Sequence, residues 1–102
     1  MYGLFGKIMA NEGQRDSLLE HLLKAADSVR GLEGCYLYVI NIVPDDPNAI
    51  AVFEVWRSIE DHHASLSNEG VKAVIAGARP FIAGMGERVE VTPMGGKGLE
   101  TY

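Results

Sequence analysis

Two adjacent histidines, His62 and His63, follow a short distance after Glu54-Val55-Trp56 in the chain. An imidazole titrates near neutral pH, so either side chain could take up or release a proton in a reaction. Glu54 alternates with apolar residues, and a carboxylate in such surroundings needs a partner or takes a raised pKa. The alternative is structural: a histidine that only hydrogen-bonds a carbonyl group, and Trp56 as a core or interface anchor. The residue types alone leave both interpretations open.

Metal chemistry fits the same residues less well. Adjacent helical positions project about 100° apart, which is poor geometry for two ligands of one ion. Glu60 and Asp61 fall in the first turn of the predicted helix, where acidic side chains interact favourably with the helix dipole. The sequence therefore predicts no metal site.

A predicted strand holds the glutamate and the tryptophan. Residues 49–56 are rich in β-branched and aromatic side chains, which is typical of a strand. Period two places Glu54 and Trp56 on the same face as Ile50 and Val52. The carboxylate is therefore expected on a largely apolar surface.

The helix after this strand carries both histidines. Ser58 is a suitable N-cap for it, with an acidic residue three positions later. Apolar residues and histidines then recur at helical spacing, as Ile59, His62, His63 and Leu66. We therefore expect both imidazoles to point roughly toward the apolar stripe of this helix.

Hydrophobic periodicity and capping residues predict the other elements. Asn11 and Gln14 form a potential capping box for a long amphipathic helix. A break at residues 67–70 precedes a further helix, which Pro80 should end. The predicted strands cover residues 2–10, 35–43, 49–56 and 88–92, and the predicted helices cover 12–29, the segment after Ser58, and 71–78. This βαββαβ order indicates an α+β, ferredoxin-like fold with an antiparallel four-stranded sheet.

The composition restricts the partners and the cellular compartment. The 102 residues are 47% hydrophobic and 23% charged, which is typical of one globular domain. A net charge of −5 leaves no basic field for nucleic acid. The single cysteine, Cys35, cannot form an intrachain disulfide, and no export signal or membrane anchor is recognised. We expect a cytoplasmic protein without a membrane partner.

The apolar character of both strand faces predicts a second copy of the chain. Helices in this topology cover one face of the sheet, yet residues 35–43 and 49–56 are apolar on both faces. A homodimer would bury sheet against sheet. We expect one domain over residues 1–92 and a glycine-rich tail over 93–102, which could dock on the partner subunit through Leu99 or Tyr102.

The βαββαβ order is accompanied by short motifs. They are Glu54-x-Trp56 at the strand end, the helix with His62 and Ser65-Leu66, and the following Val71-x-x-Val74-Ile75. Together these features resemble the antibiotic biosynthesis monooxygenase (ABM) domain of the dimeric α+β barrel superfamily. The resemblance covers about residues 2–92, nearly the whole chain.

The resemblance implies oxygen insertion into a small hydroxyaromatic, quinol or anthrone-like substrate without flavin, haem or metal. A deprotonated phenol can itself pass an electron to O₂, so the protein need supply only a base, oriented hydrogen bonds and a dry pocket. The resemblance implies His62 or His63 as the base. Glu54, the carboxylate on an apolar strand face, is the further catalytic candidate. No cofactor is expected.

The resemblance also implies substrate-binding roles for aromatic, amide and cationic side chains. Trp56 would stack on the substrate ring, and Asn11 would orient a substrate oxygen. Independently of the resemblance, Tyr38 and Phe53 are expected to add aromatic surface for a flat substrate. Arg79, or Arg57 in its place, would stabilise a phenolate or superoxide.

The chain departs from the family pattern in its helical histidine. Many members carry that histidine at the position of Ser65, and His62 stands where an apolar or aromatic residue is frequent. The haem-degrading branch combines a residue like Asn11 with a tryptophan at Ser65 and a histidine near Ile75, and two of these three are missing. Two other classes remain: a non-catalytic, small-hydrophobe-binding or stress-related dimeric module, and a cofactor-free isomerase, cyclase or decarboxylase.

Overall fold

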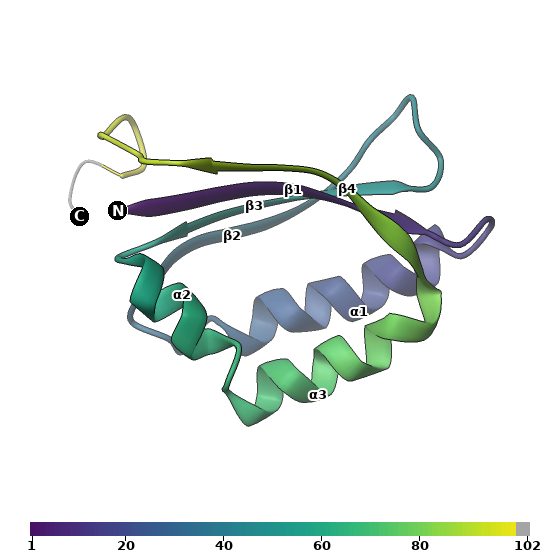
Figure 1. Ribbon diagram of the computed structural model, residues 1–102, viewed down its shortest axis with the longest axis horizontal. Helices are drawn as coiled ribbons and strands as arrows, with labels where there is room; N and C mark the ends of the chain where they lie inside the picture. The colour runs from purple at the N-terminus through teal and green to yellow at the C-terminus, as the bar shows by residue number, and fades with distance from the viewer. Residues whose placement is uncertain (100–102) are drawn as a thin grey trace.

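The structure, a computed structural model, describes residues 1–99 as one sheet packed on helices (Figure 1). The elements are β1 (Tyr2–Ala10), α1 (Arg15–Ser28), β2 (Cys35–Ile42), β3 (Ala49–Trp56), α2 (Ile59–Ser65), α3 (Glu69–Ala78), the 3₁₀ turn η1 (Arg79–Phe81) and β4 (Ile82–Val91). The strands lie antiparallel in the order β2-β3-β1-β4. Helices α1 and α3 run side by side over one face of the sheet, and α2 lies at one end (Figure 1). The α+β ferredoxin-like fold predicted from the sequence is confirmed.

The face of the sheet toward the helices, here called the inner face, carries the core. Its central pairs are Tyr2 with Trp56, Leu4 with Glu54, Gly6 with Val52, and Ile8 with Ile50. Ile50 and Val52 pack against Leu18 and Leu22 of α1, and Ile50 and Leu18 are fully buried. Each such side chain stabilises the fold by about 1.5–3 kcal/mol relative to leaving it in water.

The opposite, outer face of the sheet is also apolar, and no helix within residues 1–99 covers it (Figure 1). Phe53 is 41% exposed there, and its ring lies 5.1 Å from that of Phe5. Three further apolar side chains are comparably exposed: Val39, Val89 and Val91. The contiguous apolar surface agrees with the sequence argument that something must cover this face.

The start of α1 differs from the prediction. The helix begins at Arg15 rather than at residue 12, and its N-cap, Gln14, makes no side-chain capping bond. Asn11 instead donates to Gln14 Oε1 (3.0 Å) and to the carbonyl of Pro80 (2.9 Å). The chain turns before the helix through Gly13, whose φ of 76° favours glycine. The predicted capping box at Asn11 is therefore wrong, and this side chain links the end of β1 to the start of η1.

Strand β4 is longer than predicted. It begins at Ile82 instead of residue 88 and pairs with β1 across a register shift between Gly6 and Ile8. Gly84 and Gly86 weaken the local strand signal, but pairing with β1 supplies the backbone hydrogen bonds that local propensity does not.

The capping of α2 and α3 follows the prediction, whereas the buried face of α2 does not. Ser58 Oγ accepts from the backbone N–H of Asp61 (3.1 Å), and Asn68 caps α3 in the same way. The buried residues of α2 are His62 and Ser65, while Ile59 and Leu66 are exposed. Only one of the two imidazoles therefore faces the interior. None of the helices in the described part of the chain has the length and apolar character to cross a membrane.

Candidate functional site

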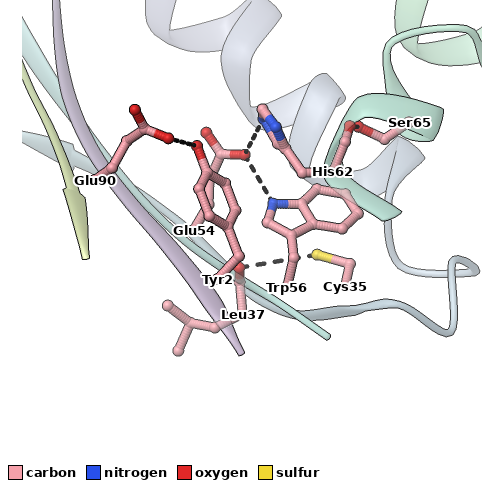
Figure 2. Close-up of polar contacts among 8 residues, drawn as sticks. All are labelled: Tyr2, Cys35, Leu37, Glu54, Trp56, His62, Ser65 and Glu90. Atoms are coloured by element: carbon pink, nitrogen blue, oxygen red, sulfur yellow. Dashed lines mark hydrogen bonds and ion pairs between the residues drawn. The ribbon is translucent and has the colours of Figure 1, made fainter. Parts of the chain in front are cut away.

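Glu54 is the centre of a small polar cluster on the inner face of the sheet (Figure 2). The indole Nε1 of Trp56 donates to Glu54 Oε1 (3.0 Å), although the two residues are on the same strand. Nε2 of His62, from α2, lies 3.6 Å from the same oxygen. The carboxylate is thus held from its own strand and faced by an imidazole from the helix that follows.

The imidazole of His62 lies next to this carboxylate and packs between two aromatic rings. Its ring centroid is 5.3 Å from that of Tyr2 and 5.5 Å from that of Trp56. The residue is 8% exposed, and its Nδ1 atom is buried without a hydrogen-bond partner among the described residues. Tyr2 in turn donates its hydroxyl to Glu90 Oε2 (2.9 Å), which fixes the ring that packs on the imidazole (Figure 2).

Burial shifts the pKa values of both titratable groups toward their neutral forms. It raises the pKa of Glu54, and the Trp56 hydrogen bond and the charge of Arg88 offset only part of that increase. Burial also lowers the pKa of His62, as do the neighbouring His63 and Arg88. A neutral imidazole and a carboxyl group with a raised pKa are suited to proton transfer at moderate pH.

The lowered pKa of His62 predicts a loss of stability in acid. A folded-state pKa below the unfolded value of about 6.5 means that the unfolded chain binds the proton more readily. The free energy of unfolding should therefore fall as pH decreases through and below that value. In His62→Gln this part of the acid sensitivity should disappear, as measured by urea unfolding of both proteins between neutral and mildly acidic pH.

Equal acid sensitivity in the two proteins would contradict this reading of His62. A wild-type protein that gains stability relative to the variant in acid would mean that the imidazolium is paired with an ionised Glu54.

A cavity of about 230 Å³ lies on the inner face beside Glu54. Its lining comes from all four strands: Leu4, Gly6, Lys7, Ile8, Tyr38, Val52, Glu54, Met85, Gly86, Glu87 and Arg88. Apolar side chains dominate its walls, and Met85, which is 70% exposed, marks its mouth. A largely apolar hollow with a mostly buried carboxylate and an arginine in its lining is typical of a small-molecule site.

A larger hollow of about 470 Å³ lies between the loop before β2 and helix α2. It contains neither Glu54 nor His62 in its lining, within the described residues. Two of its charged groups form an ion pair with each other, in which Arg57 Nε donates to Asp61 Oδ2 (2.7 Å). The smaller cavity is therefore the better candidate for chemistry.

The structure brings together only some of the residues proposed from the sequence. Glu54, His62, Trp56 and Tyr38 gather on the inner face, and Glu54 and Tyr38 line the cavity. Trp56 is 1% exposed, so its ring faces are covered by protein. The other candidates lie elsewhere: His63 and Arg79 are exposed, Phe53 is on the outer face, and Asn11 is bound to Pro80 at the far end of β1.

Sequence reasoning missed most of the cavity lining, including Gly6 and Arg88, and it missed Tyr2 beside His62. Tyr2 is the first strand residue, and its packing on His62 depends on tertiary contacts. Arg88 reaches the cavity because β4 pairs with β1. Gly6 carried a usable signal, since a glycine inside a strand often marks close approach by a ligand or another backbone. Among residues 1–99, no group of three histidine, cysteine or acidic side chains is placed to hold a metal ion.

Comparison with known proteins identifies the family. The profile of the family described as antibiotic biosynthesis monooxygenase matches residues 1–77. The chain belongs to the ABM family. It is also similar to a solved structure from Chloroflexus aurantiacus, itself provisionally named an antibiotic biosynthesis monooxygenase. The identity is 46% with a TM-score of 0.88, over 96% of this chain and 97% of the other.

More distant solved structures share the fold. PA3566 from Pseudomonas aeruginosa is 17% identical with a TM-score of 0.81, over 92% of this chain and 94% of the other. A Deinococcus radiodurans protein, also provisionally named an antibiotic biosynthesis monooxygenase, is 20% identical with a TM-score of 0.79, over 94% and 95%. A comparison with curated proteins gave no match.

Proposed function

We propose that this ABM-family protein is a cofactor-independent monooxygenase that acts on a small hydroxyaromatic or quinol. The observation that carries the proposal is the mostly buried carboxylate of Glu54, which lines a largely apolar cavity of about 230 Å³. A base in a dry pocket is what a phenol needs before it can react with O₂. Membership in the ABM family supports the reaction class.

The first step is proton removal from the substrate hydroxyl by the Glu54 carboxylate. Trp56 Nε1 fixes one carboxylate oxygen by its hydrogen bond (3.0 Å), and Nε2 of His62 lies 3.6 Å from the same oxygen. His62 therefore acts through Glu54 as a positioning residue. Arg88, which lines the cavity, offers a positive charge to the phenolate and to reduced oxygen.

The oxygenation step then balances without a further reductant. The phenolate transfers one electron to O₂, and the resulting radicals join by a new C–O bond at the ring carbon next to the oxygen. The peroxide takes up the proton held by Glu54. Loss of the ring C–H proton breaks the O–O bond and releases water. One quinol and one O₂ thus give one hydroxyquinone and one water.

The direct test is oxygen consumption by the pure protein with a panel of quinols and other hydroxyaromatics. The proposal predicts protein-dependent uptake of O₂ and a product with one more oxygen atom and two fewer hydrogen atoms than the quinol. Ligand-induced thermal stabilisation without turnover would instead favour a binding module. Conversion that proceeds without O₂ would favour an isomerase, cyclase or decarboxylase.

We also propose that the protein forms a homodimer through the outer face of the sheet. The exposed apolar side chains there, Phe53 among them, support a sheet-to-sheet contact. Phe53→Glu places a charge in that contact and should shift the sedimentation mass from twice 11.1 kDa to 11.1 kDa. Leu23→Glu, at an exposed apolar position on α1, is the matched control and should leave the dimer intact. A wild-type mass of 11.1 kDa at micromolar concentration would refute the dimer.

A further inference from the structure

Gly6 occupies the middle of the inner face, where a side chain would normally contribute to the core. It lies on β1, between Val52 of β3 and Arg88 of β4. Val52 is buried in the core, yet Gly6 remains partly exposed and lines the cavity. The hollow on the sheet is thus located where this strand lacks a side chain.

Neither backbone conformation nor close packing requires a glycine at this position. The φ angle of Gly6 lies outside the left-handed region that favours glycine. A Cβ atom added to Gly6 would meet only the carbonyl oxygen of Glu87, at 4.0 Å. By contrast, a Cβ on Gly3 would lie 2.6 Å from Val91, and one on Gly86 would lie 2.9 Å from Lys7. Steric crowding therefore explains why a glycine is needed at positions 3 and 86, but it does not explain the glycine at position 6.

The size of the cavity limits what can lie over Gly6. A cavity of about 150 Å³ is sufficient to enclose a benzene molecule. The cavity here is about 230 Å³, which leaves room for one ring with its substituents. Three fused rings would extend beyond the part of the hollow that lies over Gly6.

The position of Gly6 relative to Glu54 gives the ring its orientation. Gly6 pairs with Val52, so Glu54, two residues further along β3 on the same face, is its diagonal neighbour. Such neighbours are about 7–8 Å apart, roughly the span of a hydroxylated ring. A ring lying flat on Gly6 can therefore present its hydroxyl group to the Glu54 carboxylate.

We propose that Gly6 is the specificity-determining residue of this site, and that it selects a single-ring hydroxyaromatic whose face lies on the Gly6 backbone and whose hydroxyl meets Glu54. This inference rests on the proposed function for its ligand class. It excludes tricyclic, anthrone-like substrates, which the family resemblance alone would allow.

The test is anaerobic calorimetric titration with two probes, methylhydroquinone and anthrone. The wild-type protein should bind methylhydroquinone and bind anthrone at least about tenfold more weakly, because the larger ring system overfills the cavity. Gly6→Val fills the hollow and should weaken methylhydroquinone binding by about tenfold or more, with Gly6→Ala intermediate. Gly84→Val, on β4 opposite Met9 and outside the cavity lining, is the matched control and should bind as the wild type does.

The possible outcomes test the role of Gly6 and the oxygenase activity separately. Equal methylhydroquinone affinity in wild type and in folded Gly6→Val or Gly6→Ala would overturn the role of Gly6, as would anthrone binding as tight as that of methylhydroquinone. The predicted affinities without any oxygen consumption in air would retain the role of Gly6 and refute the oxygenase. No binding of methylhydroquinone to the wild type would refute both. Circular dichroism and the melting temperature establish that each variant is folded.

Discussion

Glu54→Gln is expected to lower kcat for quinol oxygenation by about 10²–10⁴-fold, the usual contribution of a general base. The glutamine side chain has the size of glutamate, and its amide oxygen can still accept the hydrogen bond from Trp56 Nε1. It cannot take the substrate proton. Because the cavity keeps its shape, KM and anaerobic ligand affinity should change much less than kcat.

The pH dependence provides an independent test of the same residue. Because burial raises the pKa of Glu54, the wild-type rate should rise with pH around a midpoint above the ordinary glutamate value of about 4.3. That dependence should be absent in Glu54→Gln. Glu60→Gln, on the exposed side of α2, is the control and should retain both the rate and the pH profile. A Glu54→Gln variant with more than about a tenth of the wild-type kcat would exclude Glu54 as the base.

Trp56→Ala is expected to lower the free energy of unfolding by about 3–5 kcal/mol, the usual loss for a buried large aromatic side chain. Trp56 is among the largest fully buried side chains, and it packs with Tyr2, Val29 and Val71. Its removal also leaves Glu54 without its indole donor in a buried setting. Small domains are stable by only about 5–15 kcal/mol in total, so the variant should be close to unfolding.

Trp56→Phe separates packing from hydrogen bonding in this effect. Phenylalanine keeps most of the buried aromatic surface but offers no donor to Glu54. Its loss, measured by urea unfolding, should be clearly smaller than that of the alanine variant. If Trp56→Ala were destabilised by less than about 1 kcal/mol, the end of the sheet near α2 would not depend on this core cluster.

The elements with strong local signals could be predicted from the sequence. Strands β1 and β3 have the predicted bounds. In β3, β-branched and aromatic residues follow the turn residues 44–48, and in β1 large apolar residues run up to Asn11, which ends the strand. Most of β4 could not be predicted, because Gly84 and Gly86 weaken its local propensity and only pairing with β1 makes it a strand. The false capping box at Asn11 has a similar cause, since its side chain bonds Pro80, far away in the sequence.

Prediction of the candidate site was likewise limited to features with a local sequence signal. Glu54 could be singled out because a carboxylate among apolar strand residues needs an explanation, and period two placed it beside Trp56 on the same face. Which histidine points inward could not be predicted, because the buried face of α2 is set by docking against Tyr2 and Trp56 rather than by its own apolar residues. Arg88 joins the cavity only through the pairing of β4 with β1.

Isotope labelling decides whether Glu54 activates a hydroxyaromatic for direct reaction with O₂. The protein is incubated with methylhydroquinone under ¹⁸O₂ in buffer with a metal chelator, beside Glu54→Gln and a protein-free control. The wild type should form a hydroxyquinone with one ¹⁸O atom, and this product should be nearly absent from the other two samples. Product without ¹⁸O, or equal labelling in all three samples, would contradict this mechanism.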